Sequence, residues 1–104
     1  MSQVEYIQPV NIEAEQAVLG SMMIEQKALT QGLALLKVTD FYRPTHQEIF
    51  AAIQELEKHG QPCELHTLTE IMKQRNSLLE CGGVEYLMIC VDRVPTAANI
   101  EYYA

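Results

Sequence analysis

Apolar residues recur every three or four positions along most of this chain, which is the spacing of helices that turn one face toward a core. The clearest example covers residues 11–24, NIEAEQAVLGSMMI. Asn11 is a good N-cap, and Glu13 and Glu15 lie where the helix dipole favours negative charge. At about 100° per residue, one arc of this helix carries Ile12, Val18, Leu19, Met22 and Met23. We expect it to be the central helix against which the other segments pack.

Gly20 points away from that arc and leaves a flat place on the opposite side of the helix, where a second helix could approach closely. A glycine inside a helix costs about 1 kcal/mol relative to alanine. Close packing would justify this cost, and simple tolerance of a glycine would account for it equally well.

The remaining apolar segments predict further helices, so the expected fold is all-α, a small globular bundle of about six helices. Pro44 suits the first turn of a helix, TLTE at 67–70 fits a capping box, and Gly82-Gly83 breaks the chain. Asp40 can cap a turn over 38–43. The expected helices cover 27–37, 44–58, 67 through Leu79, 84–93 and the residues from 97 onward.

Composition narrows the possible functions. The chain carries 14 acidic and 7 basic residues, a formal charge of -7, and the basic residues form no stripe, which argues against direct, non-specific binding of nucleic acid. The three cysteines follow no CxxC spacing and favour a reducing compartment. No apolar run reaches the roughly 18 residues that would span a membrane.

We expect an arm over 1–10, one globular unit over 11–95 and the start of another helix over 96–104.

No set of residues looks catalytic. The GxxxxGK[ST] and GxGxxG loops that bind phosphates are missing from the sequence, and Cys63 and His66 lack the second pair of ligands that a zinc site needs. His46 falls on the apolar face of its helix, where a hydrogen-bonded core histidine is expected. Glu15 falls within the apolar arc of the first helix, so we expect a neighbouring segment to supply its hydrogen-bond partner.

The segment 84–93, VEYLMICVDR, is apolar on two sides. A helix of this kind either lies sandwiched inside the domain or offers its second face to another chain, and the sequence leaves both possibilities open. One face carries Val84, Leu87, Met88 and Val91, and the other carries Tyr86, Ile89, Cys90 and Arg93.

Four segments in order, NIEAEQAVLG, DFYRPTHQEIF, ECGGVEYL and VPTAANIEYYA, resemble the N-terminal domain of bacterial replicative DNA helicases of the DnaB type. The resemblance implies a helical subdomain followed by a helical hairpin, a linker and a RecA-like motor domain that binds ATP and Mg. Residues 96–104 would then be the truncated start of that hairpin. It also implies self-association into a hexameric collar, a trimer of dimers, on which primase docks, with a helicase loader as a further partner. DNA would be contacted mainly by the motor domain, and the protein would act in the cytoplasm at the replication fork.

Carried over onto matching positions, the resemblance places Glu13 and Tyr86 on or near the surface that communicates with primase, and Gly20, Ile89 and Arg93 complete the candidate partner-binding set. An ordinary exposed glutamate and a tyrosine packed between two helices are the alternatives. The fragment itself is expected to have no enzymatic activity and no cofactor. A free-standing helical adaptor of the replication machinery is the competing function, and a small hydrolase or metal enzyme is the third and least supported.

Overall fold

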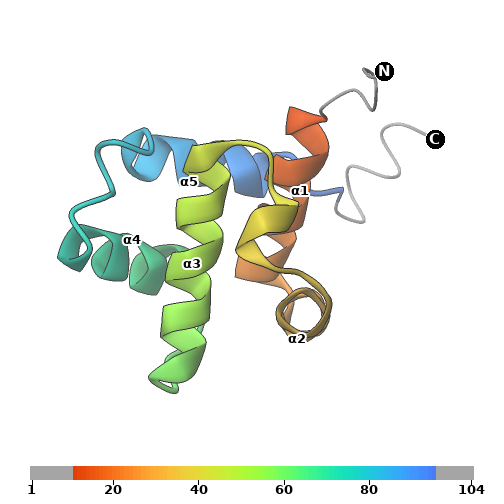
Figure 1. Cartoon of the computed structure of the whole chain (residues 1–104), viewed down its shortest axis with the longest axis horizontal. Coiled ribbons are helices and arrows are strands. Elements are labelled where there is room, and N and C mark those ends of the chain that lie inside the picture. Colours follow the sequence, from red (N-terminus) through yellow and green to blue (C-terminus); the bar gives the residue numbers. More distant parts are fainter. Residues whose placement is uncertain (1–10, 96–104) are drawn as a thin grey trace.

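The computed structural model describes residues 11–95, which form a helical bundle (Figure 1). The expected arm over 1–10 and the expected helix from 97 onward lie outside the described residues. The elements are α1 (Ile12–Ile24), α2 (Gln26–Leu35), the 3-10 helix η1 (Val38–Asp40), α3 (Pro44–Lys58), α4 (Leu65–Gln74) and α5 (Gly83–Asp92). Within this part of the chain the all-α prediction is confirmed.

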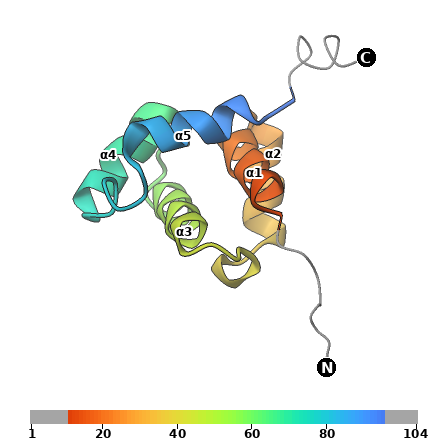
Figure 2. The same ribbon diagram turned by 90° about the horizontal axis from the view of Figure 1, so that it is seen from above.

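The arrangement places α5 across the bundle. Seen from above, α5 runs from α4 at one side to α1 at the other, and α3 lies below it between them (Figure 2). The core fills the space between α1, α3, α4 and α5, and α2 packs on α1. Its fully buried side chains include Leu19, Ile49, Phe50, Ile53, Leu56, Leu68, Met72 and Leu87.

Local signals set several element ends as predicted. Asn11 caps α1 by accepting from the Ala14 amide at 2.9 Å. Asp40 caps η1 by accepting from the Lys37 amide at 2.8 Å. At the start of α5 the chain turns through Gly82, the N-cap, and Gly83, the first helical residue, whose φ angles of 100° and 74° lie in the left-handed region that glycine adopts without strain.

The close-packing explanation of Gly20 is the correct one. A Cβ at this position would lie 2.1 Å from the carbonyl oxygen of Cys90 and 2.8 Å from Cγ2 of Val94. The backbone of α5 therefore occupies the place that a side chain would fill on α1, and this contact sets how closely the two helices approach.

Three predicted details of α1 and α4 are wrong. Val18 is 38% exposed, whereas Gln16 is buried, because α5 covers a side of α1 that the projected arc left out. The helix α4 begins at Leu65 and not at a cap on Thr67, whose hydroxyl instead donates to the Pro62 carbonyl and accepts from the Glu64 amide. Its expected continuation to Leu79 is also wrong, since α4 ends at Gln74 and Leu79 is 89% exposed in the following loop.

The predicted division of α5 into two faces is wrong at two residues. Cys90, assigned to the second face, is fully buried beside Leu87, and Met88, assigned to the core face, is 49% exposed. Ile89 beside it is 43% exposed. One side of α5 thus fills the core while Met88 and Ile89 reach solvent, so the helix is not sandwiched.

Candidate interaction site

The candidate partner-binding residues gather where α1 and α5 cross. Arg93 follows the end of α5 and donates from Nε to Oε1 of Gln16 at 3.0 Å, and its Nη1 lies 3.7 Å from Oε2 of Glu13. Ile89 lies one turn earlier on the exposed side of α5. Gly20 differs from the others because it is buried under the Cys90 carbonyl. Its contribution is to bring the two helices together, and it offers no surface to a partner.

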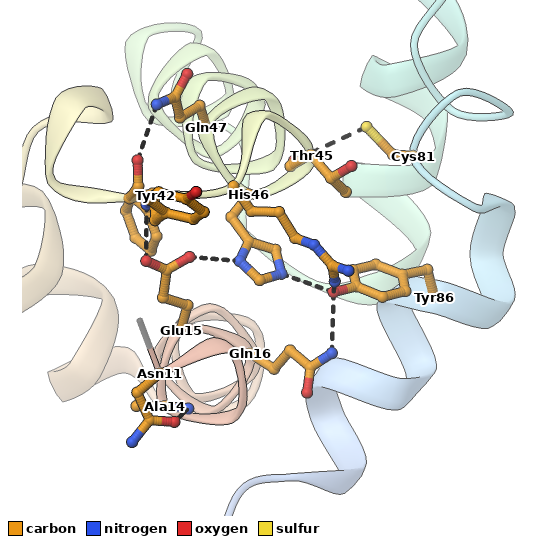
Figure 3. Close-up of polar contacts among 12 residues, drawn as sticks. Asn11, Ala14, Glu15, Gln16, Tyr42, Thr45, His46, Gln47, Cys81 and Tyr86 are labelled. Carbon is orange, nitrogen blue, oxygen red and sulfur yellow. Dashed lines mark hydrogen bonds and ion pairs between the residues drawn. The ribbon is translucent and has the colours of Figure 1, made fainter. Parts of the chain in front are cut away.

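Tyr86 lies within a polar network that joins three helices (Figure 3). Its hydroxyl is 2.6 Å from Nε2 of His46, and Nδ1 of the same imidazole is 2.7 Å from Oε1 of Glu15. The rings of His46 and Tyr86 are stacked, with centroids 5.8 Å apart. Glu15 from α1, His46 from α3 and Tyr86 from α5 therefore form one chain of hydrogen bonds across the bundle.

Two further donors reach the same hydroxyl, and together they fix where the protons lie. Because Arg93 can only donate, the Gln16 atom facing it is the amide oxygen, and the Gln16 NH₂ group must face Tyr86, to which it donates at 2.9 Å. Arg43 donates to the same hydroxyl from Nη1 at 3.1 Å. Both lone pairs of the hydroxyl are then occupied, so Tyr86 donates its proton to Nε2 of His46.

This count assigns the tautomer of His46. With Tyr86 donating to Nε2, the proton that His46 shares with Glu15 is the one on Nδ1. The side chain of His46 is fully buried, and both of its ring nitrogens are satisfied. The prediction of a hydrogen-bonded core histidine is confirmed.

Glu15 is also satisfied on both of its oxygens. Oε1 accepts from His46, and Oε2 accepts from the Tyr42 amide at 2.7 Å. Partial burial acts to raise the pKa of this carboxyl, but the hydrogen bonds from His46 and from the backbone of Tyr42 and Arg43 outweigh it and hold the pKa below its ordinary value. The predicted partner from a neighbouring segment is confirmed, and it is the start of α3.

Gln16 and Arg43 also belong to this site, and no sequence pattern predicts either of them. Gln16 is 6% exposed, although its residue type is usually found at the surface. Arg43 precedes Pro44 as the N-cap of α3, which places its side chain beside Tyr86, 43 residues further along the chain. No local pattern carries this information, because both residues are defined by contacts between distant helices.

One cavity in the described part of the chain is lined by several charged side chains. This cavity, of about 660 Å³, includes Glu48 and Glu80, which would repel phosphates, and its Arg75 already binds Glu48 and Glu55. Over residues 11–95 no group of three or more His, Cys, Asp or Glu side chains could hold a metal ion. In the same part of the chain, no helix has the length and apolar character needed to cross a membrane.

Comparison with known proteins identifies the family. The DnaB-like helicase N-terminal domain family matches residues 7–104. The chain is 47% identical over 100 residues to the replicative DNA helicase DnaB of Geobacillus stearothermophilus, covering 96% of this chain and 22% of that protein. It is 48% identical over 96 residues to the replicative DNA helicase DnaC of Bacillus subtilis, covering 92% of this chain and 21% of that protein.

A solved structure agrees with these matches. The N-terminal domain of DnaB helicase from Mycobacterium tuberculosis superposes with a TM-score of 0.81 at 40% sequence identity, covering 91% of this chain and 69% of that one. The chain spans about a fifth of the length of the curated relatives it matches. It belongs to the family of DnaB-like helicase N-terminal domains.

Proposed function

We propose that this domain is part of the collar of a replicative DNA helicase, where it supports assembly of the hexamer and docks primase. The relatives it matches are replicative DNA helicases, which favours this function over a free-standing adaptor. ATP and Mg would be bound by a motor domain, since the described residues form no phosphate-binding loop and the cavity beside Arg75 is lined by carboxylates. The place of action would be the cytoplasm, at the replication fork, with a helicase loader as a further partner.

The observation that carries the docking proposal is the exposed side of α5. The opposite side of α5 packs into the core. Ile89 and Met88 are 43% and 49% exposed, so these side chains are not used for packing within the described domain. Arg93 lies one turn beyond Ile89, and its Nη1 is 3.7 Å from Oε2 of Glu13. An apolar centre with a polar rim is the usual anatomy of a protein interface. We propose the exposed side of α5 as the docking surface for primase. Self-association into a trimer of dimers would need a further surface with the same anatomy.

The coupling between priming and unwinding would follow from differential affinity. If primase binds one arrangement of the collar more tightly than another, its binding shifts the collar toward that arrangement. At saturating primase, the equilibrium constant between the two arrangements changes by the ratio of the two affinities. No further contact between primase and the motor is then required.

The test is an NMR titration of the isotope-labelled chain with the C-terminal domain of its cognate primase. We expect amide shifts at Glu13, Tyr86, Ile89 and Arg93. Ile89→Ser should weaken binding about tenfold, because it removes apolar area from the centre of the contact. Leu35→Ser is the matched control, since Leu35 is 77% exposed on α2 and the change in residue type is similar.

Two results would count against docking at this site. Shifts confined to α2 or α4 would move the interface to another face of the domain. Equal loss of affinity in Ile89→Ser and Leu35→Ser would show that the serine substitutions act through general hydrophobicity and not through the α5 surface.

A further inference from the structure

We propose that Arg43 binds a carboxylate of the docking partner. Tyr86 and the Glu15–His46 pair act as positioning residues, because they fix the orientation of the Arg43 guanidinium. This inference rests on the docking function proposed above and adds the chemistry of the partner, an acidic segment.

The side chain of Arg43 is exposed but anchored. Its Nη1 donates to the Tyr86 hydroxyl at 3.1 Å, and that hydroxyl is itself fixed by Gln16 at 2.9 Å and His46 at 2.6 Å. His46 in turn is held by Glu15. A long surface side chain thus ends on a network whose other members are buried or half-buried, which reduces the rotamer freedom it would lose on binding.

Most of the binding capacity of this guanidinium is unused within the described residues. A guanidinium has five N–H donors, and one hydrogen bond of the Arg43 guanidinium is defined by the structure. The other two arginines are paired with acids, since Arg75 binds Glu48 and Glu55 and Arg93 lies 3.7 Å from Glu13. Arg43 forms no such pair with a carboxylate between residues 11 and 95.

The neighbouring acid does not compete for Arg43. Both oxygens of Glu15 are engaged, one by His46 and the other by the Tyr42 amide. A planar guanidinium fixed at one edge presents parallel donors that match a carboxylate in a bidentate arrangement. The charge of -7 on the chain as a whole opposes long-range attraction of an acidic segment, so the binding rests on the local, charge-assisted pair between a carboxylate and the Arg43 guanidinium.

The probe is a short peptide of glutamate and alanine, and the same peptide with glutamine in place of glutamate is its control. The measurement is the side-chain Nε–H signal of Arg43 in the labelled chain. We expect the glutamate peptide to shift this signal and the glutamine peptide to leave it unchanged. The Nε–H of Arg75 is the internal control, because its guanidinium is already occupied.

Two variants separate binding from positioning. Arg43→Lys keeps the charge but loses the bidentate geometry, and we expect peptide affinity to fall about fivefold. Tyr86→Phe keeps Arg43 and the aromatic ring but removes the anchor, and we expect a similar fall together with increased ps–ns motion of the Arg43 side chain, measured without any peptide. Nitrogen shifts of His46 should report the Nδ1–H tautomer in the unmodified chain and a change in Tyr86→Phe.

Each outcome decides a separate point. No shift of Arg43 with the glutamate peptide would overturn the carboxylate site, whether or not primase binds the domain. Equal affinity and equal Arg43 motion in the unmodified chain and in Tyr86→Phe would overturn the positioning role. If the glutamate peptide shifts the Arg43 signal but the domain does not bind primase, the carboxylate site stands. Primase is then refuted as the docking partner.

Discussion

The contact between Gly20 and the Cys90 carbonyl leads to the sharpest prediction about stability. In Gly20→Ala the new Cβ would lie 2.1 Å from that oxygen, whereas real Cβ contacts are almost never shorter than 3.0 Å. The obstacle is backbone and cannot rotate away. The helix α5 must therefore move from α1 by about 0.9 Å, the difference between these two distances.

The cost follows from what α5 buries. A gap of about 0.5–1 Å forfeits roughly a quarter to a half of each dispersion contact, and complete burial of a side chain such as Leu87 is worth about 1.5–3 kcal/mol. Loosened packing around Leu87 and Cys90 then costs about 1–2 kcal/mol, and residual overpacking adds about 1–3 kcal/mol. Alanine recovers about 1 kcal/mol of helix propensity. We expect Gly20→Ala to lower the free energy of unfolding by about 1–4 kcal/mol.

Gly32→Ala is the matched control. This glycine is also helical and buried, but its new Cβ would meet Sδ of Met22 at 2.8 Å and Cε at 2.9 Å, at the flexible end of a side chain. The gain in helix propensity offsets the movement of Met22, so we expect a change within about 0.5 kcal/mol. Urea unfolding followed by circular dichroism measures both variants. A stability of Gly20→Ala equal to that of Gly32→Ala would refute the close approach of α1 and α5.

Two further predictions concern charged groups. Arg75→Met should lower the free energy of unfolding by about 1–3 kcal/mol in urea melts, because Arg75 binds both carboxylate oxygens of Glu48 and also binds Glu55. An unchanged urea midpoint would show that these half-buried ion pairs contribute no stability. The stability contributed by Glu15 should be fully present above its ordinary pKa of 4.5 and be lost as the pH falls through its lowered folded value, because the unfolded chain binds the proton more tightly. Glu15→Gln should flatten this part of the pH profile of unfolding, and an unaltered profile would show that the hydrogen bond to His46 has no net effect on the carboxyl.

The sequence was sufficient for elements whose ends have strong local signals. The bounds of α3 match the prediction because Pro44 sets its start and Gly60 follows its end. The predicted start of α4 is wrong because Thr67 can bond within the first turn as an N3 residue as well as at an N-cap. The two roles share one local sequence pattern, and the hydrogen bond from Thr67 to the Pro62 carbonyl distinguishes them.

Burial on α1 and α5 required knowledge of the partners of each helix. The arc of apolar residues does not include Gln16, and an amide costs free energy when it is removed from water without hydrogen bonds. Here Tyr86 and Arg93, 70 and 77 residues away, supply those bonds. Periodicity alone assigns residues to faces by their type, so it cannot identify a polar residue whose burial is made possible by a distant segment.

The same long-range sharing bears on how the candidate site should be tested. Tyr86 accepts from Arg43 and Gln16 and donates to His46, so replacing it with alanine removes the proposed partner contact and three internal hydrogen bonds at once. A loss of primase stimulation in Tyr86→Ala is expected, but that loss alone cannot separate contact from positioning. Tyr86→Phe retains the ring that a partner would touch and removes only the hydroxyl. If binding survives in Tyr86→Phe but is lost in Tyr86→Ala, the ring is the contact; if both lose it equally, the hydroxyl acts by holding Arg43 in place.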